Sequence, residues 1–176
     1  MSMFGPDIEP PAWANDAEAY YSRIEAGSGD SVRVMRFPGA GEASEENPGT
    51  LCLRLVASFR QVRVLGANDV EHGLIRSRGP GFGYAMLRSG QPIWALSNRS
   101  LVLRRHALRF ANDGQWDVRT PFFLWMNVVC SEDGVAHALG QVLHTKRFWQ
   151  LWIQPGYDRL EVLAALAFLH RRWWRR

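Results

Sequence analysis

The stretch that decides the fold is DRLEVLAALAFLHRRWWRR, which covers residues 158–176 and ends the printed sequence. Nine of the ten residues from Leu160 to Leu169 are apolar, and Glu161 is the exception. Asp158 is a suitable N-cap, and the Arg residues that follow the apolar run suit the partial negative charge at a helix C-terminus. The stretch therefore predicts a helix that begins at about Arg159 and has no polar face along its apolar run.

A helix that is apolar on all sides lies either in a membrane or inside a protein. The apolar run is about ten residues long, or roughly 15 Å as a helix, whereas the hydrocarbon core of a bilayer needs about 20 residues. The first residues, MSMFGPDIEPPAWAND, have neither the basic start nor the apolar centre of a secretory signal. We therefore expect a helix that is wrapped by the protein itself, no transmembrane span, and a soluble cytoplasmic protein.

From Thr50 onward the chain predicts a succession of short strands. TLCLRLVA, residues 50–57, alternates between two faces with the period of two that is typical of a strand. Asn112-Asp113-Gly114 lies between two such runs and is a hairpin signal. About ten short strands with turns roughly every 8–12 residues predict an antiparallel meander that is closed or nearly closed.

The two predictions fit together. A barrel of about ten or more strands encloses an interior that strand side chains alone do not fill. A helix threaded through it would fill that space, and the small Ala164, Ala165 and Ala167 would let the strands approach closely. The sequence thus predicts a mainly β fold, in which an antiparallel barrel encloses a hydrophobic C-terminal helix.

The N-terminal segment differs from the rest in charge. Residues 1–48 hold nine acids and three Arg, a net charge of −6, so the remaining residues 49–176 carry +10. NDAEAYYSRIEAG, residues 15–27, predicts a short helix, and Val32 to Phe37 predict a strand before a Gly-, Glu- and Pro-rich linker. We therefore divide the chain into an acidic leader, residues 1–48, and a barrel with a central C-terminal helix, residues 50–176.

The end of the last predicted strand carries the pattern W-x-L-x-I-x-P-G-x-D over residues 149–158, directly before the apolar LEVLAALAFL. This combination resembles the tubby C-terminal-like superfamily, and within it the phospholipid scramblase and LURP-one-related branch. LRSGQPIWALSNRSLVLRRHALRFANDGQWDVR, residues 87–119, is similar to the repeated hairpins of that superfamily. The resemblance covers roughly residues 50–176 and implies about twelve strands wound round a hydrophobic C-terminal helix. His170 stands where related helices tend to carry an acid.

The sequence does not favour an enzyme. The five His residues are scattered, the isolated Cys52 and Cys130 lie in apolar strand-like runs, and no G-x-S-x-G or Walker motif is present. We expect no catalytic residue, no metal and no cofactor. The Gly-rich RSRGPGFGYAM, residues 76–86, predicts a loop whose Arg76 and Arg78 form a basic rim and a possible anion contact.

The candidate binding site consists of basic and aromatic residues in RRHALR and HRRWWRR. Arg and Trp suit a membrane interface, where Arg meets phosphate and Trp lies at headgroup depth. The candidate residues for anionic headgroups are Arg104, Arg105, Arg171, Arg172, Trp173, Trp174, Arg175 and Arg176. Two plainer interpretations stay open: RRHALR as a solvated strand edge, and Trp173 or Trp174 as the plug of the barrel opening.

Three functions follow from these features. The first is a non-catalytic module that binds the headgroups of an anionic phospholipid surface, peripherally and from the cytoplasm. The alternative is a protein–protein interaction adaptor that uses the acidic leader or an open barrel mouth. Nucleic-acid binding, in which the Trp residues would stack on bases, is a minor third possibility.

Overall fold

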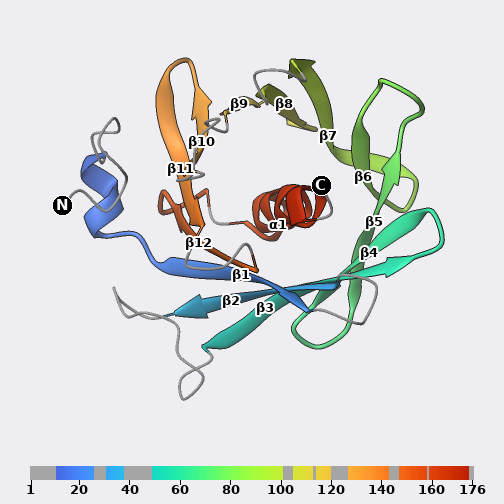
Figure 1. Cartoon of the computed structure of the whole chain (residues 1–176), viewed down its shortest axis with the longest axis horizontal. Coiled ribbons are helices and arrows are strands. Elements are labelled where there is room, and N and C mark those ends of the chain that lie inside the picture. Colours follow the sequence, from blue (N-terminus) through green and yellow to red (C-terminus); the bar gives the residue numbers. More distant parts are fainter. Residues whose placement is uncertain are drawn as a thin grey trace.

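Strands of five to ten residues form one closed antiparallel sheet in the computed structural model of the chain (Figure 1). Each strand pairs with the next along the chain, and β1 pairs with β12 to close the barrel. The structure describes residues 11–25, 31–37, 49–100, 105–112, 114–119, 127–142, 147–157 and 159–174.

A short 3-10 helix, Ala12–Asn15, precedes the barrel, and the helix α1, Leu160–Trp174, follows it. The strands are β1 (Ala19–Glu25), β2 (Ser31–Phe37), β3 (Thr50–Ser58), β4 (Gln61–Gly66), β5 (Glu71–Ser77), β6 (Tyr84–Arg88), β7 (Gln91–Ser100), β8 (Arg105–Phe110), β9 (Gln115–Arg119), β10 (Asn127–Glu132), β11 (Val135–Val142) and β12 (Phe148–Ile153). The predicted fold class is confirmed: a twelve-stranded antiparallel barrel surrounds a C-terminal helix.

Two predictions for the N-terminal segment are wrong. The stretch predicted as a helix, residues 15–27, contains β1, and the barrel starts at Ala19 rather than at residue 50. The reason is tertiary pairing: β1 forms ladders with both β2 and β12, which overrides a local helix signal. Without β1, the edges of β2 and β12 would be open. The linker between β2 and β3 lies, except for Gly49, outside the described residues.

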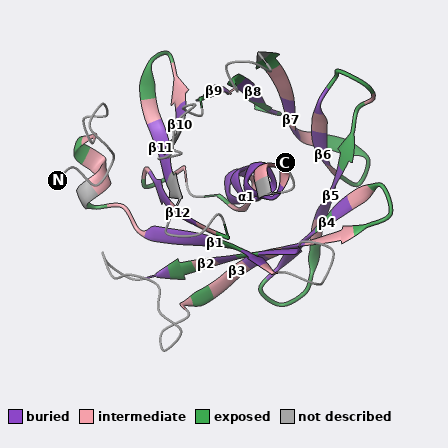
Figure 2. Cartoon of the chain, in the orientation of Figure 1, coloured by how far each residue is buried: buried purple, intermediate pink, exposed green. Residues whose placement is uncertain are grey.

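The helix α1 fills the barrel, as predicted. Every residue from Val162 to Leu169 is at most 4% exposed, and Figure 2 shows this part of α1 as buried inside the ring of strands. Ala164, Ala165 and Ala167 are fully buried, and α1 contacts β1, β2, β3 and β7. Small side chains at these positions let the backbone of the helix come close to the sheet.

Each end of α1 is fixed by a specific polar contact. Near the N-terminal end, Glu161 forms an ion pair with Arg88 at the end of β6, at 3.3 Å. Near the C-terminal end, the ring of His170 stacks on Trp149 with 4.6 Å between centroids, and its Nδ1 lies 2.8 Å from the Ser22 hydroxyl. The predicted N-cap, Asp158, lies outside the described residues.

The antiparallel order gives the barrel two different mouths. The chain leaves β12 at one mouth, passes through the barrel as α1, and ends α1 at the other. Because successive strands alternate in direction, the β3–β4 turn and the β5–β6 loop lie at the mouth where α1 ends. The β4–β5 and β6–β7 turns lie at the opposite mouth, together with the Glu161–Arg88 ion pair.

A charge placed inside the barrel tests the role of α1. Leu163 and Leu166 are 4% and 1% exposed, so Leu163→Asp or Leu166→Asp would bury an unpaired carboxylate. We expect a loss of about 3–5 kcal/mol in the free energy of unfolding, enough to unfold a domain of ordinary stability. Circular dichroism and urea denaturation measure the effect.

The matched control for these variants is Val135→Asp, since Val135 is 59% exposed at the start of β11. This variant introduces the same side chain on the surface, opposite Glu132 in the β10–β11 ladder, and should cost no more than about 1 kcal/mol. A folded and soluble Leu163→Asp or Leu166→Asp protein would contradict the central role of the helix.

The reactivity of the cysteine thiols provides a second test of burial inside the barrel. Burial raises the pKa of the Cys130 thiol to about 12, because the thiolate would lose its solvation. Cys52 is only partly buried. In a Cys52→Ser variant we expect no reaction of Cys130 with Ellman's reagent at pH 8 until denaturant unfolds the barrel, since the thiolate is the reactive species. Equal rates with and without denaturant would show that Cys130 is accessible.

Candidate functional site

A pocket of about 940 Å³ opens at the mouth where α1 ends, and we call it the mouth pocket. It is bordered by the β3–β4 turn, by β4, β5 and β6, by the β5–β6 loop, and by the last turns of α1. Its lining residues are Ser58, Arg60, Gln61, Val62, Ile75, Arg76, Ser77, Gly79, Tyr84, Phe168, Arg171 and Arg172. The lining therefore combines arginines with small polar groups and an apolar wall.

Four arginines from three separate parts of the chain meet at this pocket. Arg60 comes from the β3–β4 turn, Arg76 from β5, and Arg171 and Arg172 from α1. Among the described lining residues there is no Asp, Glu, His or Cys. A site with this composition attracts anions, because guanidinium groups offer several N–H donors to a phosphate or a carboxylate.

Several carboxylates of the barrel form ion pairs with arginines that do not line the mouth pocket. At the same mouth, Glu25 pairs with Arg33 at 2.7 Å. Asp117, in the middle of β9, pairs with Arg99 at 3.4 Å. Further ion pairs, on other parts of the barrel, are Arg36–Glu18, Arg54–Asp69, Arg63–Glu71 and Arg88–Glu161. The described lining of the mouth pocket itself contains no carboxylate.

Aromatic contacts hold the end of α1 against the pocket wall. Phe168 and Arg172 are four residues apart and so lie on one face of the helix. Phe168 meets Tyr84 edge to face, with 4.9 Å between centroids, and the guanidinium of Arg172 lies 4.6 Å from the centre of the Tyr84 ring. Arg171 is only 7% exposed, while Arg172 is partly buried. The packing of the barrel interior therefore fixes these two cations.

Arg76 and Arg60 are positioned by the sheet. Arg76 lies opposite Gln61 in the β4–β5 ladder, and its Nε donates a hydrogen bond of 3.0 Å to the Gln61 side-chain oxygen. Arg60 follows Phe59 in the tight β3–β4 turn, with a φ of 62°, and its guanidinium lies 5.0 Å from the centre of the Phe59 ring. Arg60 is exposed, so its charge stands at the pocket entrance.

The β5–β6 loop forms another border of the pocket and depends on glycine. Gly79, Gly81 and Gly83 all have positive φ angles, of 114°, 79° and 83°. Gly83 also lies against β7, where a Cβ atom would be only 2.0 Å from the carbonyl oxygen of Leu96. A backbone hydrogen bond joins the two ends of the loop: the Arg78 amide donates to the Gly83 carbonyl at 2.9 Å.

Two glycine variants test this account of the loop. Gly83→Ala combines an unfavourable φ with a backbone clash, whereas Gly81→Ala has the same kind of φ and nothing within 4 Å. We expect Gly81→Ala to cost about 1–2 kcal/mol, the price of a left-handed non-glycine residue. Gly83→Ala should cost clearly more, because β7 has to move. Urea denaturation measures both; equal costs would mean that Gly83 does not anchor the loop.

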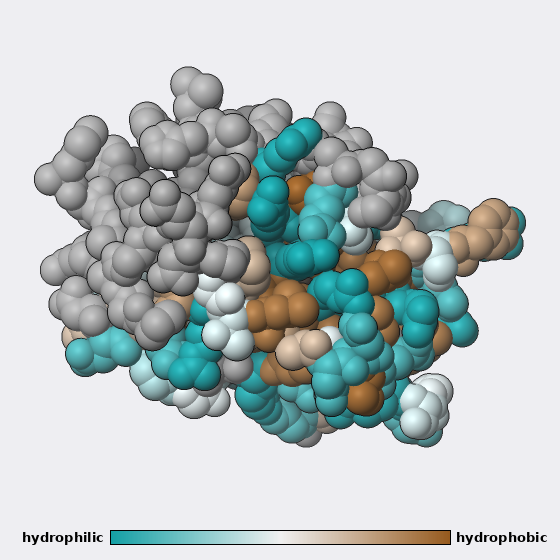
Figure 3. Space-filling view, turned by 90° about the horizontal axis from the view of Figure 1, so that it is seen from below, coloured by the Kyte–Doolittle hydropathy of each residue, from teal (hydrophilic) through white to brown (hydrophobic). Residues whose placement is uncertain are grey.

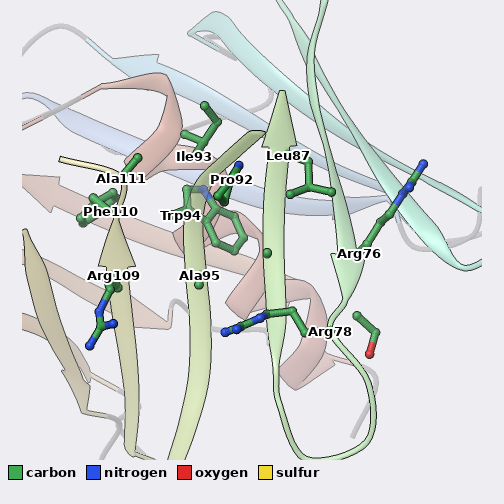
Figure 4. Close-up of a pocket in the computed structure, with 12 residues that line it drawn as sticks. Arg76, Arg78, Leu87, Pro92, Ile93, Trp94, Ala95, Arg109, Phe110 and Ala111 are labelled. Carbon is green, nitrogen blue, oxygen red and sulfur yellow. The ribbon is translucent and has the colours of Figure 1, made fainter. Parts of the chain in front are cut away.

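A second pocket, of about 550 Å³, lies beside β5–β8 and shares Arg76 and Ser77 with the mouth pocket. Figure 4 shows its lining: Arg78 reaches across β6 towards β7, while the side chains of Arg76 and Arg109 point away from the middle. Most of the rest is apolar, with Leu87, Pro92 and Ile93 among the lining residues. This surface concentrates less charge than the mouth pocket.

One further side of the molecule has an apolar area. Figure 3 shows the barrel from below, and hydrophobic residues gather in the middle of this side between hydrophilic side chains. Such areas are ordinary on soluble proteins when they are small.

The structure brings together part of the predicted site. Arg171 and Arg172 line the mouth pocket, and the exposed Arg105 stands at the start of β8 at the same mouth, opposite Arg119 of β9. Trp173 packs inward against Trp149, with 4.9 Å between ring centroids, and is partly buried against the core. This packing is compatible with the interpretation of Trp173 as a plug, which stays a prediction. Arg104, Arg175, Arg176 and the side chain of Trp174 lie outside what the structure describes.

Several pocket residues were not found from the sequence. Arg76 was singled out beside the Gly-rich loop, but Arg60, Gln61 and Tyr84 were not. The available signal for Arg60 was a bulky pair, Phe59-Arg60, in a turn position where small residues are usual. Only the closed order of the strands places that turn beside the end of α1.

Comparisons with protein-family models, with curated proteins and with solved structures give no match to this chain. The fold and the site therefore define the class of protein: a closed twelve-stranded barrel with a helix through its centre and an arginine-lined pocket at one mouth. Within the described part of the chain, no helix has the length and hydrophobicity to cross a bilayer, and no three potential metal ligands cluster.

Proposed function

We propose that this protein is a non-catalytic module that binds the phosphate-bearing headgroup of an anionic phospholipid in the mouth pocket. The observation that carries the proposal is the meeting of Arg60, Arg76, Arg171 and Arg172 in one pocket whose described lining has no carboxylate. Arg forms short, charge-assisted and often bidentate hydrogen bonds with phosphate oxygens. A cavity of about 940 Å³ is large enough for a headgroup.

The rest of the lining suits a headgroup as well. Ser58, Ser77 and Gln61 offer hydrogen-bonding groups beside the arginines, and Val62 and Ile75 offer an apolar surface for the carbon atoms of the ligand. Acid–base and nucleophilic catalysis usually needs a His, Cys, Asp or Glu at the reacting atoms. The described lining has none of these, which favours binding over catalysis.

The charge of the whole mouth supports contact with a surface. Besides the pocket arginines, the exposed Arg78, Arg105, Arg119 and Arg147 lie at strand ends around the same mouth. Anionic lipids attract such residues by about 1 kcal/mol per cation near the surface. We therefore propose that the module acts peripherally, at the cytoplasmic face of a membrane. Membership in the tubby C-terminal-like superfamily stays a prediction that agrees with this proposal.

A protein-interaction adaptor is the second candidate, and the apolar groove beside β5–β8 is the observation that favours it. A protein partner bound in this groove would share only Arg76 and Ser77 with a ligand in the mouth pocket. Nucleic-acid binding through stacked Trp residues has less support, because Trp173 packs against Trp149 inside the mouth.

Vesicle binding tests the proposal. The purified protein should cosediment with phosphatidylcholine vesicles that contain phosphatidylserine, and not with phosphatidylcholine alone. We expect the double variant Arg60→Ala/Arg76→Ala to bind at least about tenfold more weakly, since two cations at the surface contribute about 2 kcal/mol. High salt should weaken binding of the wild type, because surface charges are screened.

The matched control is Arg63→Ala/Arg109→Ala. Both residues are exposed on the outer side of the barrel, away from the mouth pocket, and the variant loses the same two charges. A control variant that binds as weakly as the pocket variant would show that net charge, and not the mouth pocket, drives association. Equal binding of the wild-type protein to neutral and to anionic vesicles would contradict the proposal itself.

A further inference from the structure

Two phenylalanines stand exposed beside the mouth pocket. Phe59 is 85% exposed and Phe82 is 66% exposed. Among the described residues, the other large exposed hydrophobic side chains are Val70, at 52%, and Val135, at 59%, and both lie at the opposite mouth. A phenylalanine that stays mostly exposed contributes less to folding than a buried one, and two such rings beside one pocket invite another explanation.

Both rings are held by well-defined turns. Phe59 and Arg60 form the whole connection between Ser58 and Gln61, which pair directly in the β3–β4 ladder. In the β5–β6 loop, the Phe82 amide donates to the Gly79 carbonyl at 3.2 Å. These turns project their aromatic residues away from the barrel interior instead of folding them back onto it.

The same two turns border the mouth pocket. Ser58 and Arg60, the neighbours of Phe59, line it, and so does Gly79, to which Phe82 is hydrogen-bonded. A surface that approached the pocket along its opening would therefore meet both rings and the arginines together. This mouth of the barrel is therefore amphipathic: the pocket holds four arginines, and the two turns beside it each expose a phenylalanine ring.

We infer that Phe59 and Phe82 are membrane anchors, which insert into the interfacial region of an anionic bilayer and hold the mouth pocket against its headgroups. The inference rests on the proposed headgroup binding. It adds the orientation of the protein on the membrane and an apolar contribution of the two rings to the binding free energy. Aromatic residues prefer the boundary between headgroups and acyl chains. The Arg60 guanidinium, 5.0 Å from the centre of the Phe59 ring, would remain at phosphate depth while the ring enters.

Phe59 and Phe82 are better suited to contact with a bilayer than with a protein surface. A stable protein interface buries about 800 Å² on each partner around a packed apolar centre. Two separated rings at the edge of a charged mouth do not form such a centre, whereas each ring can enter a bilayer by itself. The surrounding positive charge, with Arg78 next to the loop of Phe82, matches an anionic lipid surface.

The experiment compares three double variants with the wild type. Phe59→Ser/Phe82→Ser removes the anchors, Val70→Ser/Val135→Ser removes the exposed hydrophobic residues at the opposite mouth, and Arg60→Ala/Arg76→Ala removes pocket charge. Each is measured by cosedimentation with phosphatidylserine-containing vesicles and by insertion into a phosphatidylserine monolayer. Calorimetry measures binding of glycerophosphoserine, the headgroup without its acyl chains. Thermal unfolding shows whether each variant is folded.

The inference predicts that the Phe variant loses about tenfold or more in vesicle affinity, from two rings that no longer leave water, and no longer inserts into the monolayer. Its affinity for glycerophosphoserine should be unchanged, and the Val variant should behave as the wild type. A Phe variant that inserts and binds vesicles like the wild type overturns the inference and leaves a protein partner as the explanation of the rings.

The results separate this inference from the proposed function. Wild-type protein that binds glycerophosphoserine but neither vesicles nor monolayers would overturn the anchors and keep the pocket. Vesicle binding that depends on the phenylalanines but not on Arg60 and Arg76 would keep the anchors and overturn the pocket. Wild-type protein that binds neither probe would overturn both.

Discussion

Eight consecutive side chains of α1, from Val162 to Leu169, occupy the space inside the barrel, and the rest of the structure depends on that packing. A ring of twelve strands encloses more volume than inward-facing strand side chains fill, and an empty apolar cavity is costly. The helix can fill it only if the ring closes around it. Closure by the β1–β12 ladder and burial of α1 are therefore parts of one cooperative unit, and neither is expected to form stably alone.

The same packing creates the mouth pocket. Because the interior holds Phe168 in place, Arg171 and Arg172 emerge at a fixed point and angle, where Tyr84 supports Arg172. The pocket is thus formed by the last turns of α1 and by the strand ends and turns around them. Its cations need little ordering when a ligand binds, which raises the affinity that a given set of contacts can give.

The sequence predicted the fold correctly where a pattern of residues had a single structural interpretation. An apolar run without a polar face, too short for a bilayer, predicted the buried helix, and period-two runs after Thr50 predicted the barrel. Strand β1 was missed because its apolar residues lie on both faces: Tyr20 and Ile24 face the core, while Tyr21 packs outside against Phe37, with 4.4 Å between ring centroids. The mouth pocket could not be predicted in full, because strand order and register decide which turns meet the end of α1.

Three local features at the mouth where α1 ends oppose stability. Arg60 occupies a left-handed conformation, as Asp69, Ser89 and Asp133 do at the opposite mouth. The same turn exposes Phe59, and Arg105 faces Arg119 across the ladder, a pairing of like charges that weakens a sheet. A sequence selected for stability alone would have placed Gly or Asn at Arg60 and polar residues at the tips. Such conflicts concentrate at functional sites, where a partner supplies the compensating contacts. An anionic surface would compensate the like charges and the exposed ring, because it pairs with the arginines and takes the ring out of water.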